Sequence, residues 1–379
     1  MNPARIMIVS GEPSGDFHAA ELVNNMRKLD PGLRFYGIGG ELSRAAGVET
    51  LYDIKDLSVV GAIEVVRHAG PIRKAFTTIL EKADKERPAL AILVDYPGFN
   101  LRLAKALKKR SIPVAYYISP QVWAWGANRI SLIKEYVRRI FVLFKFEEEL
   151  YKRHGVDAEF IGNPLMDTVR PTLAKSDILR KYGLSEEKRT VCLLTGSRTG
   201  EMRSLLGPML GAAKIIEKKL GDVQFIVSKF KDLPGEFFEK EIRRAGLGAV
   251  VIEGDTYNAL FASDFAIVAS GTATLETALI GTPFIITYKT NPVTWMIAKR
   301  IVQVKYVGIV NIVAGRQIVP EVLQYEATPE NLAAASLEIL GNPERLQRMK
   351  ADFTQLHTLL GPPGASSRAA ASILNLLKE

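Results

Sequence analysis

Several side chains able to do chemistry occur in the stretch SGEPSGD, which follows the first apolar run, RIMIVS, and precedes a helical pattern. Gly11 and Gly15 would let the backbone approach a ligand closely, and Ser14 and Asp16 are good caps for the following helix. A tight strand-to-helix turn would explain these four residues by itself. Turn geometry does not call for an acid at Glu12, however, and this favours a ligand-facing turn.

The same stretch does not predict a dinucleotide site. Its spacing is not G-x-G-x-x-G, and the next apolar run, RFYGIGG, ends in glycines where a dinucleotide site would carry a ribose-binding acid.

A second stretch, ASGTATLE, indicates a phosphate site. The small residues Ser270, Gly271 and Thr272 open a helix, whose free N–H groups and positive dipole end attract anions. Glu276, one turn later, would repel a phosphate but could accept hydrogen bonds from a ribose, and Arg198 in TGSRTGE is a fork donor suited to a diphosphate. These features together favour a nucleoside diphosphate. The structural alternative is a well-capped helix and a solvated arginine.

A third stretch, VDYPGFN, places Asp95 at the end of an apolar run. An acid there can act as a base, bind a metal or cap the helix that follows, and spacing alone leaves these three roles open. We expect no metal site, because the histidines lie far apart in the sequence without ligand spacing (His18, His68, His154 and His357). The single cysteine, Cys192, lies in the apolar run TVCLL, where we expect it to be a small buried hydrophobe.

Parallel α/β sheets are predicted in both halves of the chain. The apolar runs RIMIVS, RFYGIGG, LAILVDY, PVAYYIS, RIFVLF and AEFIGNP alternate with helical patterns, and the alternation restarts at TVCLLTGS, VQFIVSKF, AVVIEG, DFAIVAS and PFIITYK. Between the halves, MDTVRPTLAKSD is a plausible linker, and the tail from Thr328 is helical only. We therefore expect two Rossmann-like, doubly wound domains facing a cleft. Ligands of such sheets bind beyond the carboxyl ends of the strands, where the three stretches lie.

Composition limits the choice of partner. The 379 residues are 47% hydrophobic and 24% charged, which is typical of a folded globular protein, and the net charge of +9 favours anionic partners. The first apolar run is too short for a signal-peptide core, and no stretch approaches the roughly 20 apolar residues of a membrane span. We expect a cytoplasmic protein.

Nine motifs, in order, resemble the lipid-A-disaccharide synthase family: SGEPSGD, GIGG, ILVDYPGFNLRLAK, YYISPQVWAW, FEEELY, GNPL, TGSR, SGTATLETALIGTPFIITYK and VGIVNIVAGRQIVPEVLQ. The resemblance implies a GT-B fold whose last helices cross back to the first domain. It implies an N-terminal domain at 1–170 on the acceptor and membrane side, a donor-binding domain at 171–345 and returning helices at 346–379. It also implies an inverting transfer that joins UDP-2,3-diacylglucosamine to 2,3-diacylglucosamine 1-phosphate (lipid X), giving a β-1,6-linked lipid A precursor and UDP without a cofactor.

The resemblance assigns roles to residues by motif. Asp95 would remove the proton of the attacking sugar hydroxyl, with Glu12 beside it, and Arg198 with the helix opening at Thr272 would stabilise the departing phosphates without a divalent ion. The implied donor site consists of Arg198, Ser270, Gly271, Thr272, Glu276 and Asn311, and the implied acceptor loop of Ser14, Gly15 and Asp16. The chain departs from the usual family pattern at Thr195, Asn163 and Ile309–Val310, which affects the donor contacts more than the reaction.

Both implied substrates carry acyl chains, so we expect peripheral attachment to the inner face of the inner membrane of a Gram-negative bacterium. The segment 57–80 has apolar residues beside basic ones, and we expect membrane contact at Val59, Val60, Ile72, Phe76 and Ile79. The alternative is that these residues are core. A homodimer is left open.

Two other classes compete with this interpretation. A UDP-GlcNAc 2-epimerase or a peptidoglycan glycosyltransferase would keep the donor motif but has no need of ISPQVWAW. A basic nucleotide- or RNA-binding protein would need exposed aromatics among Lys and Arg, whereas most aromatics here lie inside apolar runs, so we expect no nucleic-acid partner.

Overall fold

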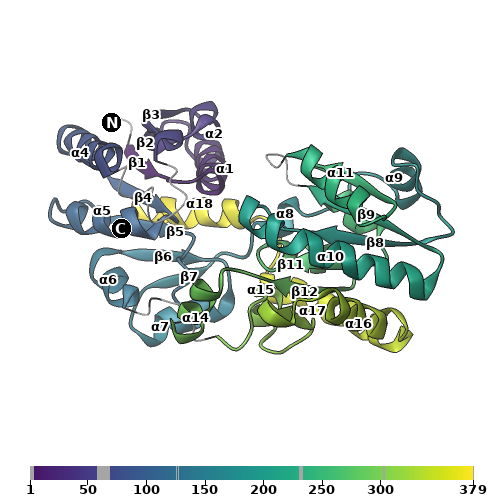
Figure 1. The fold of residues 1–379 in the computed structure, drawn as a ribbon. Coiled ribbons are helices and arrows are strands. Elements are labelled where there is room, and N and C mark those ends of the chain that lie inside the picture. Colours follow the sequence, from purple (N-terminus) through teal and green to yellow (C-terminus); the bar gives the residue numbers. More distant parts are fainter. Residues whose placement is uncertain are drawn as a thin grey trace. The chain divides into compact units, whose positions relative to one another are not determined.

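A computed structural model describes residues 4–57, 69–124, 126, 128–229, 234–301 and 304–378 (Figure 1). The chain divides into two compact units, which we describe separately. The first unit comprises Met1–Asp167 and Leu360–Glu379, and the second comprises Thr168–Leu359.

The first unit is built on a parallel sheet of seven strands in the order β3-β2-β1-β4-β5-β6-β7. The strands are β1 (Arg5–Val9), β2 (Arg34–Gly39), β3 (Val48–Asp53), β4 (Leu90–Val94), β5 (Val114–Tyr117), β6 (Arg139–Val142) and β7 (Ala158–Phe160). The helices are α1 (Pro13–Leu29), α2 (Glu41–Ala45), α4 (Ala69–Glu86), α5 (Pro97–Lys108), α6 (Arg129–Tyr136), α7 (Lys145–Arg153), α8 (Leu165–Thr168) and α18 (Ala365–Leu376), and a 3-10 turn spans Ile54–Asp56.

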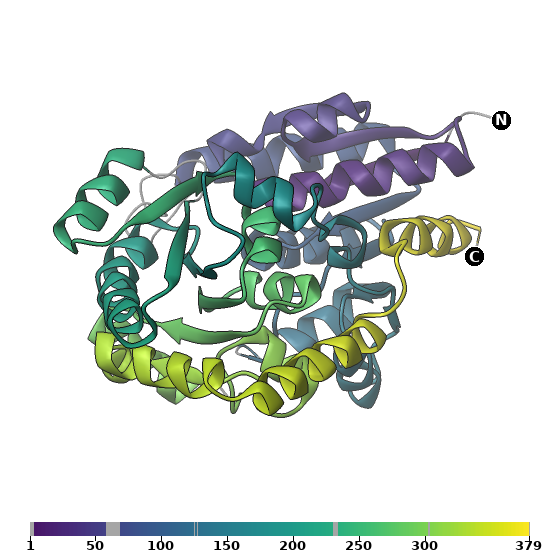
Figure 2. The ribbon, with the colours of Figure 1, turned by 90° about the vertical axis from the view of Figure 1, so that its right-hand side faces the viewer.

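Both faces of this sheet are buried, because successive strand residues point to opposite sides. Met7 and Val9 of β1 lie in a core shared with α4 and α5, whereas Ile6 and Ile8 lie in a core shared with α1 and α18. Figure 2 shows α18, the last helix of the chain, beside α1.

The second unit repeats this plan with six parallel strands in the order β10-β9-β8-β11-β12-β13. The strands are β8 (Arg189–Leu194), β9 (Val223–Lys229), β10 (Ala249–Glu253), β11 (Phe265–Ala269), β12 (Phe284–Tyr288) and β13 (Glu321–Leu323). The helices are α9 (Lys175–Lys181), α10 (Thr199–Leu220), α11 (Gly235–Arg244), α12 (Thr256–Ala262), α13 (Ala273–Ile280), α14 (Pro292–Ile301), α15 (Ile309–Ala314), α16 (Pro329–Leu340) and α17 (Pro343–Leu360), and a 3-10 turn spans Gln324–Glu326.

The predicted fold class of two doubly wound parallel sheets is confirmed, and each apolar run named above forms a strand. β3 and β13 were not predicted. β3, with the sequence VETLYD, is an edge strand that is mostly half-buried, and β13 has only three residues, so neither forms an apolar run.

The two terminal helices belong to different units. In α17, Met349 Sδ accepts a hydrogen bond from Phe284 N, and Phe353 packs on the Phe284 ring, so most of α17 belongs to the second unit. The change to the first unit falls at Leu360, some way past the boundary at 346 that we expected.

The segment 57–80 contributes to the core of the first unit. Ile79 is completely buried, and the prediction that it contacts a membrane is therefore wrong. Ile72 and Phe76 are partly buried against the same core, where Phe76 packs edge-on against Phe99. Val59 and Val60 lie outside the described residues. In the part of the chain that the structure describes, no helix has the length and apolar character needed to cross a membrane.

Asp16 has a structural role different from the one expected. Helix α1 begins at Pro13 with Glu12 as its N-cap, so the prediction that Ser14 and Asp16 cap this helix is wrong. The buried Asp16 carboxylate instead accepts hydrogen bonds from the N–H groups of Gly40 (2.6 Å), Leu42 (3.1 Å) and Ser43 (3.2 Å) and from the Ser43 hydroxyl. It therefore holds the beginning of α2 against α1.

Replacing Asp16 should destabilise the first unit. Asp16→Ala leaves several buried donors unpaired, so we expect the free energy of unfolding in urea to fall by about 2–4 kcal/mol. Ser14→Ala, at an exposed position in the same turn, is the control and should change it by less than about 0.5 kcal/mol. Equal stability of the two variants would contradict this assignment.

Candidate active site

In each unit the strand order reverses once, and the loops that leave the sheet at this point form a crevice at its carboxyl edge. In the first unit the reversal lies between β1 and β4, whose exits carry Glu12 and Asp95. In the second unit it lies between β8 and β11, whose exits carry Arg198 and Ser270–Thr272. The three stretches identified from the sequence therefore lie at the two reversal points.

The turn that presents Asp95 is held in an uncommon conformation. Asp95 and Tyr96 have φ values of 45° and 47°, in the left-handed region that side chains usually avoid. The Asn100 amide donates to the Asp95 carbonyl (2.7 Å), and the buried Tyr116 hydroxyl donates to the same oxygen (2.6 Å). These two bonds hold the strained turn in place.

Gly11 brings the exit of β1 against this turn. A Cβ atom at Gly11 would lie 2.1 Å from the nearest carbon of the Tyr96 ring, so only glycine allows the contact. Gly15 lies in the first turn of α1, where a Cβ would lie 3.4 Å from that of Ser10. Close approach between protein segments therefore explains Gly11.

Electrostatics make Asp95 a stronger base than an ordinary aspartate. Burial, and secondarily the nearby charge of Glu12, raise the pKa of Asp95 from 3.8 to about 6. The N-cap of α5 is Tyr96 rather than Asp95, so the helix-cap alternative does not describe this carboxylate. Asp95 is ionised at neutral pH and has a pKa suited to accepting a proton.

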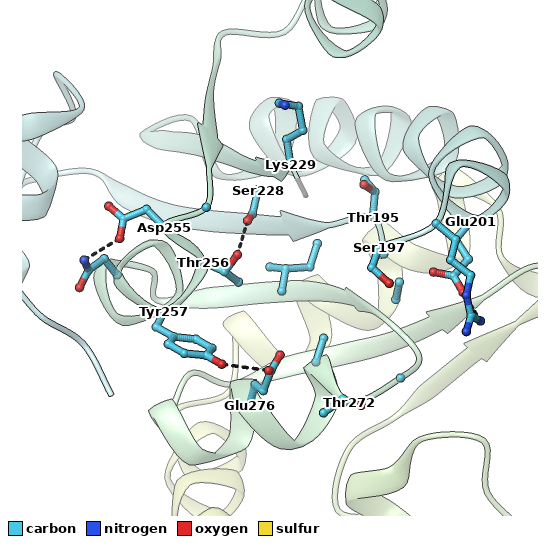
Figure 3. Close-up of a pocket in the computed structure, with 18 of the residues that line it drawn as sticks. Thr195, Ser197, Glu201, Ser228, Lys229, Asp255, Thr256, Tyr257, Thr272 and Glu276 are labelled. Carbon is cyan, nitrogen blue, oxygen red and sulfur yellow. Dashed lines mark hydrogen bonds and ion pairs between the residues drawn. The ribbon is translucent and has the colours of Figure 1, made fainter. Parts of the chain in front are cut away.

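The second unit contains a pocket of about 700 Å³, a size typical of small-molecule sites (Figure 3). Its walls come from the exits of β8, β9, β10 and β11 and from the beginnings of α10, α12 and α13. Among the residues predicted for the donor site, Arg198, Ser270, Gly271, Thr272 and Glu276 all line it.

Two helix N-termini border this pocket. Arg198 is the N-cap of α10 and Thr272 that of α13, and neither side chain makes a capping hydrogen bond. The Arg198 side chain is 79% exposed and lies 3.6 Å from the Glu201 carboxylate, so its guanidinium group is held only loosely. The positive ends of both helices and this arginine favour an anion here.

Glu276 lies deeper in the pocket wall. Its carboxylate accepts a hydrogen bond from the Tyr257 hydroxyl (3.0 Å), and burial raises the pKa of Glu276 (Figure 3). One carboxylate oxygen is thus held by Tyr257, which leaves the other to accept hydrogen bonds from ligand hydroxyls.

Asn311 is not among the residues that line the pocket. Its fully buried side chain donates to Val319 O and Glu321 Oε1 and accepts from the N–H groups of Ile318 and Val319, which uses its hydrogen-bonding capacity. Glu321 in turn accepts from Val307 N, and the Ser270 hydroxyl donates to Val307 O. Asn311 therefore supports the segment that borders Ser270 instead of facing the pocket.

Sequence reasoning missed several pocket residues. Lys229 is almost completely buried and forms an ion pair with Glu253 (2.7 Å), and Ser228 hydrogen-bonds to Thr256 (2.9 Å). Both contacts join the exit of β9 to that of β10 or to the helix that follows it. Since all these strands are parallel, their exits lie at one edge, and this rule could have identified them.

The departures from the family pattern lie in different places. Thr195 lines the pocket with its hydroxyl buried and without a hydrogen-bond partner. Asn163 is buried in the first unit, where its backbone N–H donates to Leu360 O and its side chain accepts from Leu165 N. Ile309 and Val310 begin α15. Only Thr195 borders the pocket.

Across the described ranges, no group of three or more His, Cys, Asp and Glu side chains is arranged to hold a metal ion. Cys192 is buried, as expected, and burial raises the pKa of its thiol.

Solved structures with this fold act on sugar nucleotides or bind UDP. A putative UDP-N-acetylglucosamine 2-epimerase from Listeria monocytogenes superposes with a TM-score of 0.65 at 15% identity, covering 99% of this chain and 96% of that one. A UDP-bound transferase from Siraitia grosvenorii superposes with a TM-score of 0.61 at 12% identity, covering 99% and 100%. At such identities the likeness shows the fold alone, which is the GT-B fold.

Sequence comparison is more specific. A family model described as lipid-A-disaccharide synthetase matches residues 6–374. The lipid-A-disaccharide synthase of Syntrophus aciditrophicus is 45% identical over 100% of this chain and 99% of its own length, and that of Geobacter sulfurreducens is 41% identical over 98% and 97%.

Fold and sequence together define a glycosyltransferase of the GT-B class. The chain belongs to the lipid-A-disaccharide synthetase family. The family match favours this assignment over an epimerase, a peptidoglycan glycosyltransferase or a nucleic-acid-binding protein.

Removing the charge of Asp95 should stabilise the fold. A carboxyl group whose folded-state pKa lies above its ordinary value destabilises the folded state once ionised. Asp95→Asn should therefore raise the free energy of unfolding by up to about 3 kcal/mol at about pH 8, with the gain vanishing below about pH 4. Urea titrations of both proteins at the two pH values measure this. A less stable variant at the higher pH would mean that favourable contacts hold the carboxylate.

Proposed function

We propose that the chain transfers a 2,3-diacylglucosaminyl group from UDP to the 6-hydroxyl of 2,3-diacylglucosamine 1-phosphate, forming a β-1,6 linkage and releasing UDP. The observation that carries this proposal is the buried, charge-raised Asp95 at the reversal point of the first sheet. Family membership supplies the substrate class, since the relatives are lipid-A-disaccharide synthases.

The second unit would bind the donor. We assign its diphosphate to the N-termini of α10 and α13 and to Arg198, and its ribose hydroxyls to Glu276. The exposure of Arg198 agrees with this role, because a loosely held guanidinium group can turn toward a ligand. Asn311 would act indirectly through the segment that borders Ser270.

The first unit would provide the base. As the acceptor's 6-oxygen forms a bond to C1 of the donor, the bond from C1 to the diphosphate oxygen breaks, and the hydroxyl proton passes to Asp95. Attack from the side opposite the leaving group inverts the configuration at C1. Glu12 keeps the pKa of Asp95 raised, and the helix ends with Arg198 stabilise the charge that develops on UDP.

The location follows from the substrates. Because both sugars carry acyl chains, we infer a cytoplasmic protein attached peripherally to the inner face of the inner membrane of a Gram-negative bacterium. We place the acceptor and the membrane on the side of residues 1–170 and the donor on residues 171–345. Of the predicted contact residues, Ile72 and Phe76 keep partly exposed surface for this purpose.

Release of UDP from the two acylated glucosamine substrates, supplied in detergent, tests the function directly. Product containing one new glycosidic bond, formed together with one UDP, is the expected result. Absence of transfer by a folded protein would refute the assignment.

Asp95→Asn should lower kcat by about 10²- to 10⁴-fold and leave UDP affinity unchanged, because only proton removal is lost. For the unaltered enzyme, kcat/KM for the acceptor should fall below about pH 6, where Asp95 becomes protonated. Glu12→Gln is the companion variant: removal of the like charge lowers the pKa of Asp95, so the fall in activity should move to lower pH.

An acidic limb that stays in place in Glu12→Gln would contradict the coupling of the two acids. Full activity of Asp95→Asn would remove Asp95 from the mechanism.

Arg198→Ala and Glu276→Ala should each weaken UDP binding about tenfold to a hundredfold, the first by losing charge-assisted bonds and the second by losing ribose contacts. Tyr257→Phe, which frees Glu276, should have a smaller effect. Arg203→Ala, an exposed arginine of the same helix α10 that does not line the pocket, is the control for charge. Calorimetric titration with UDP measures all four, and unchanged affinity in the first two would place the donor elsewhere.

A further inference from the structure

The segment around α14 combines basic charge with exposed apolar surface. Between Glu276 and Glu321 the sequence contains no acidic residue, whereas it contains Lys289, Lys299, Arg300, Lys305 and Arg316. A basic stretch without intervening acids attracts anionic surfaces, and the attraction is not weakened by neighbouring carboxylates of the same segment.

One side of α14 carries both kinds of side chain (labelled in Figure 1). Pro292, Trp295, Met296, Lys299 and Arg300 follow the spacing i, i+3, i+4, i+7 and i+8, which places them on one helix face. Met296 is 55% exposed, Trp295 is half-buried, and the other three are exposed. An exposed thioether and indole between two cations is unusual for a helix that faces only water.

Lysine and aromatic side chains are paired here. The Lys299 ammonium lies 5.5 Å from the centre of the Trp295 ring, and the exposed Lys305 ammonium lies 5.3 Å from that of Tyr306. Trp and Tyr prefer the boundary between water and lipid, and lysine can extend its charge to the headgroups while its carbon chain covers apolar surface.

We propose that the α14 face, defined by Trp295, Met296, Lys299 and Arg300, docks on an anionic lipid surface, with Tyr306 and Lys305 at its border. Met296 and Trp295 would enter the boundary between headgroups and acyl chains, and Lys299 and Arg300 would contact anionic headgroups. The proposal rests on the proposed function in one respect, since lipid-borne substrates bring the enzyme to such a surface. It assigns membrane contact to the second unit, separately from the segment 57–80.

Sedimentation with vesicles of equimolar phosphatidylcholine and phosphatidylglycerol tests the proposal without substrate. The unaltered protein should bind these vesicles, bind pure phosphatidylcholine far less, and dissociate as salt rises. Lys299→Ala/Arg300→Ala should weaken binding about thirtyfold, and Met296→Ser should weaken it severalfold. Lys218→Ala/Lys219→Ala removes the same charge from exposed positions of α10, and Leu29→Ser alters an apolar side chain of similar exposure (57%), so both controls should bind normally.

Fluorescence gives a second readout at the helix itself. Anionic vesicles should shift the tryptophan emission of the unaltered protein to shorter wavelength, and Trp295→Phe should lose the shift although two other tryptophans, Trp123 and Trp125, remain.

Activity on detergent-dispersed substrates separates this proposal from the proposed function. Lys299→Ala/Arg300→Ala should keep that activity while losing vesicle binding. Normal vesicle binding by this variant, equal loss in the Lys218→Ala/Lys219→Ala control, or loss of its detergent activity would overturn the docking proposal. If the unaltered protein binds vesicles through α14 but transfers no sugar, docking stands and the proposed function fails.

Discussion

The reversal of strand order in a parallel sheet is the constraint on which both sites depend. Strands on either side of the reversal send their helices to opposite faces, so their exit loops diverge and leave a crevice at the carboxyl edge. The chain contains this arrangement twice, between β1 and β4 and between β8 and β11. Because the strands are buried on both faces, the sheet is rigid, and short exit loops can hold strained turns such as Asp95–Tyr96.

The positions of the elements were largely readable from the sequence because the central strands are continuous apolar runs. β4 (LAILV) and β11 (FAIVA) are buried at every residue, and such runs bounded by Gly, Pro and Ser have few other interpretations. β3 escaped prediction since it lies at the sheet edge and mixes Glu49 and Asp53 with apolar residues. The exit loops followed from the strands, and Glu12, Asp95, Arg198 and Glu276 were found in this way.

What the sequence could not supply was the partner of each polar side chain. Asp16 lies in a motif that looks ligand-facing, yet its carboxylate is used by backbone donors that follow β2, more than twenty residues later. Asn311 lies in an equally distinctive motif but is enclosed by its own loop. In both cases the side chain stabilises the neighbourhood of a site, and spacing along the chain does not distinguish this role from direct contact. Ile79 shows the same limit for apolar residues, because an amphipathic pattern does not say which surface covers it.

The two reversal points have the same backbone plan but opposite electrostatic character. At the first, Glu12 and Asp95 bring two acids together in a partly buried setting, which disfavours ionisation and raises the pKa of Asp95. At the second, the N-termini of α10 and α13 and Arg198 provide positive potential for an anion, while Glu276 is set back in the wall beside Tyr257. A base that must accept a proton and a site that must hold a departing diphosphate require these opposite environments. Dividing them between two sheets avoids a direct conflict, since within one crevice the positive groups would lower the pKa of the base and the acids would repel the phosphates.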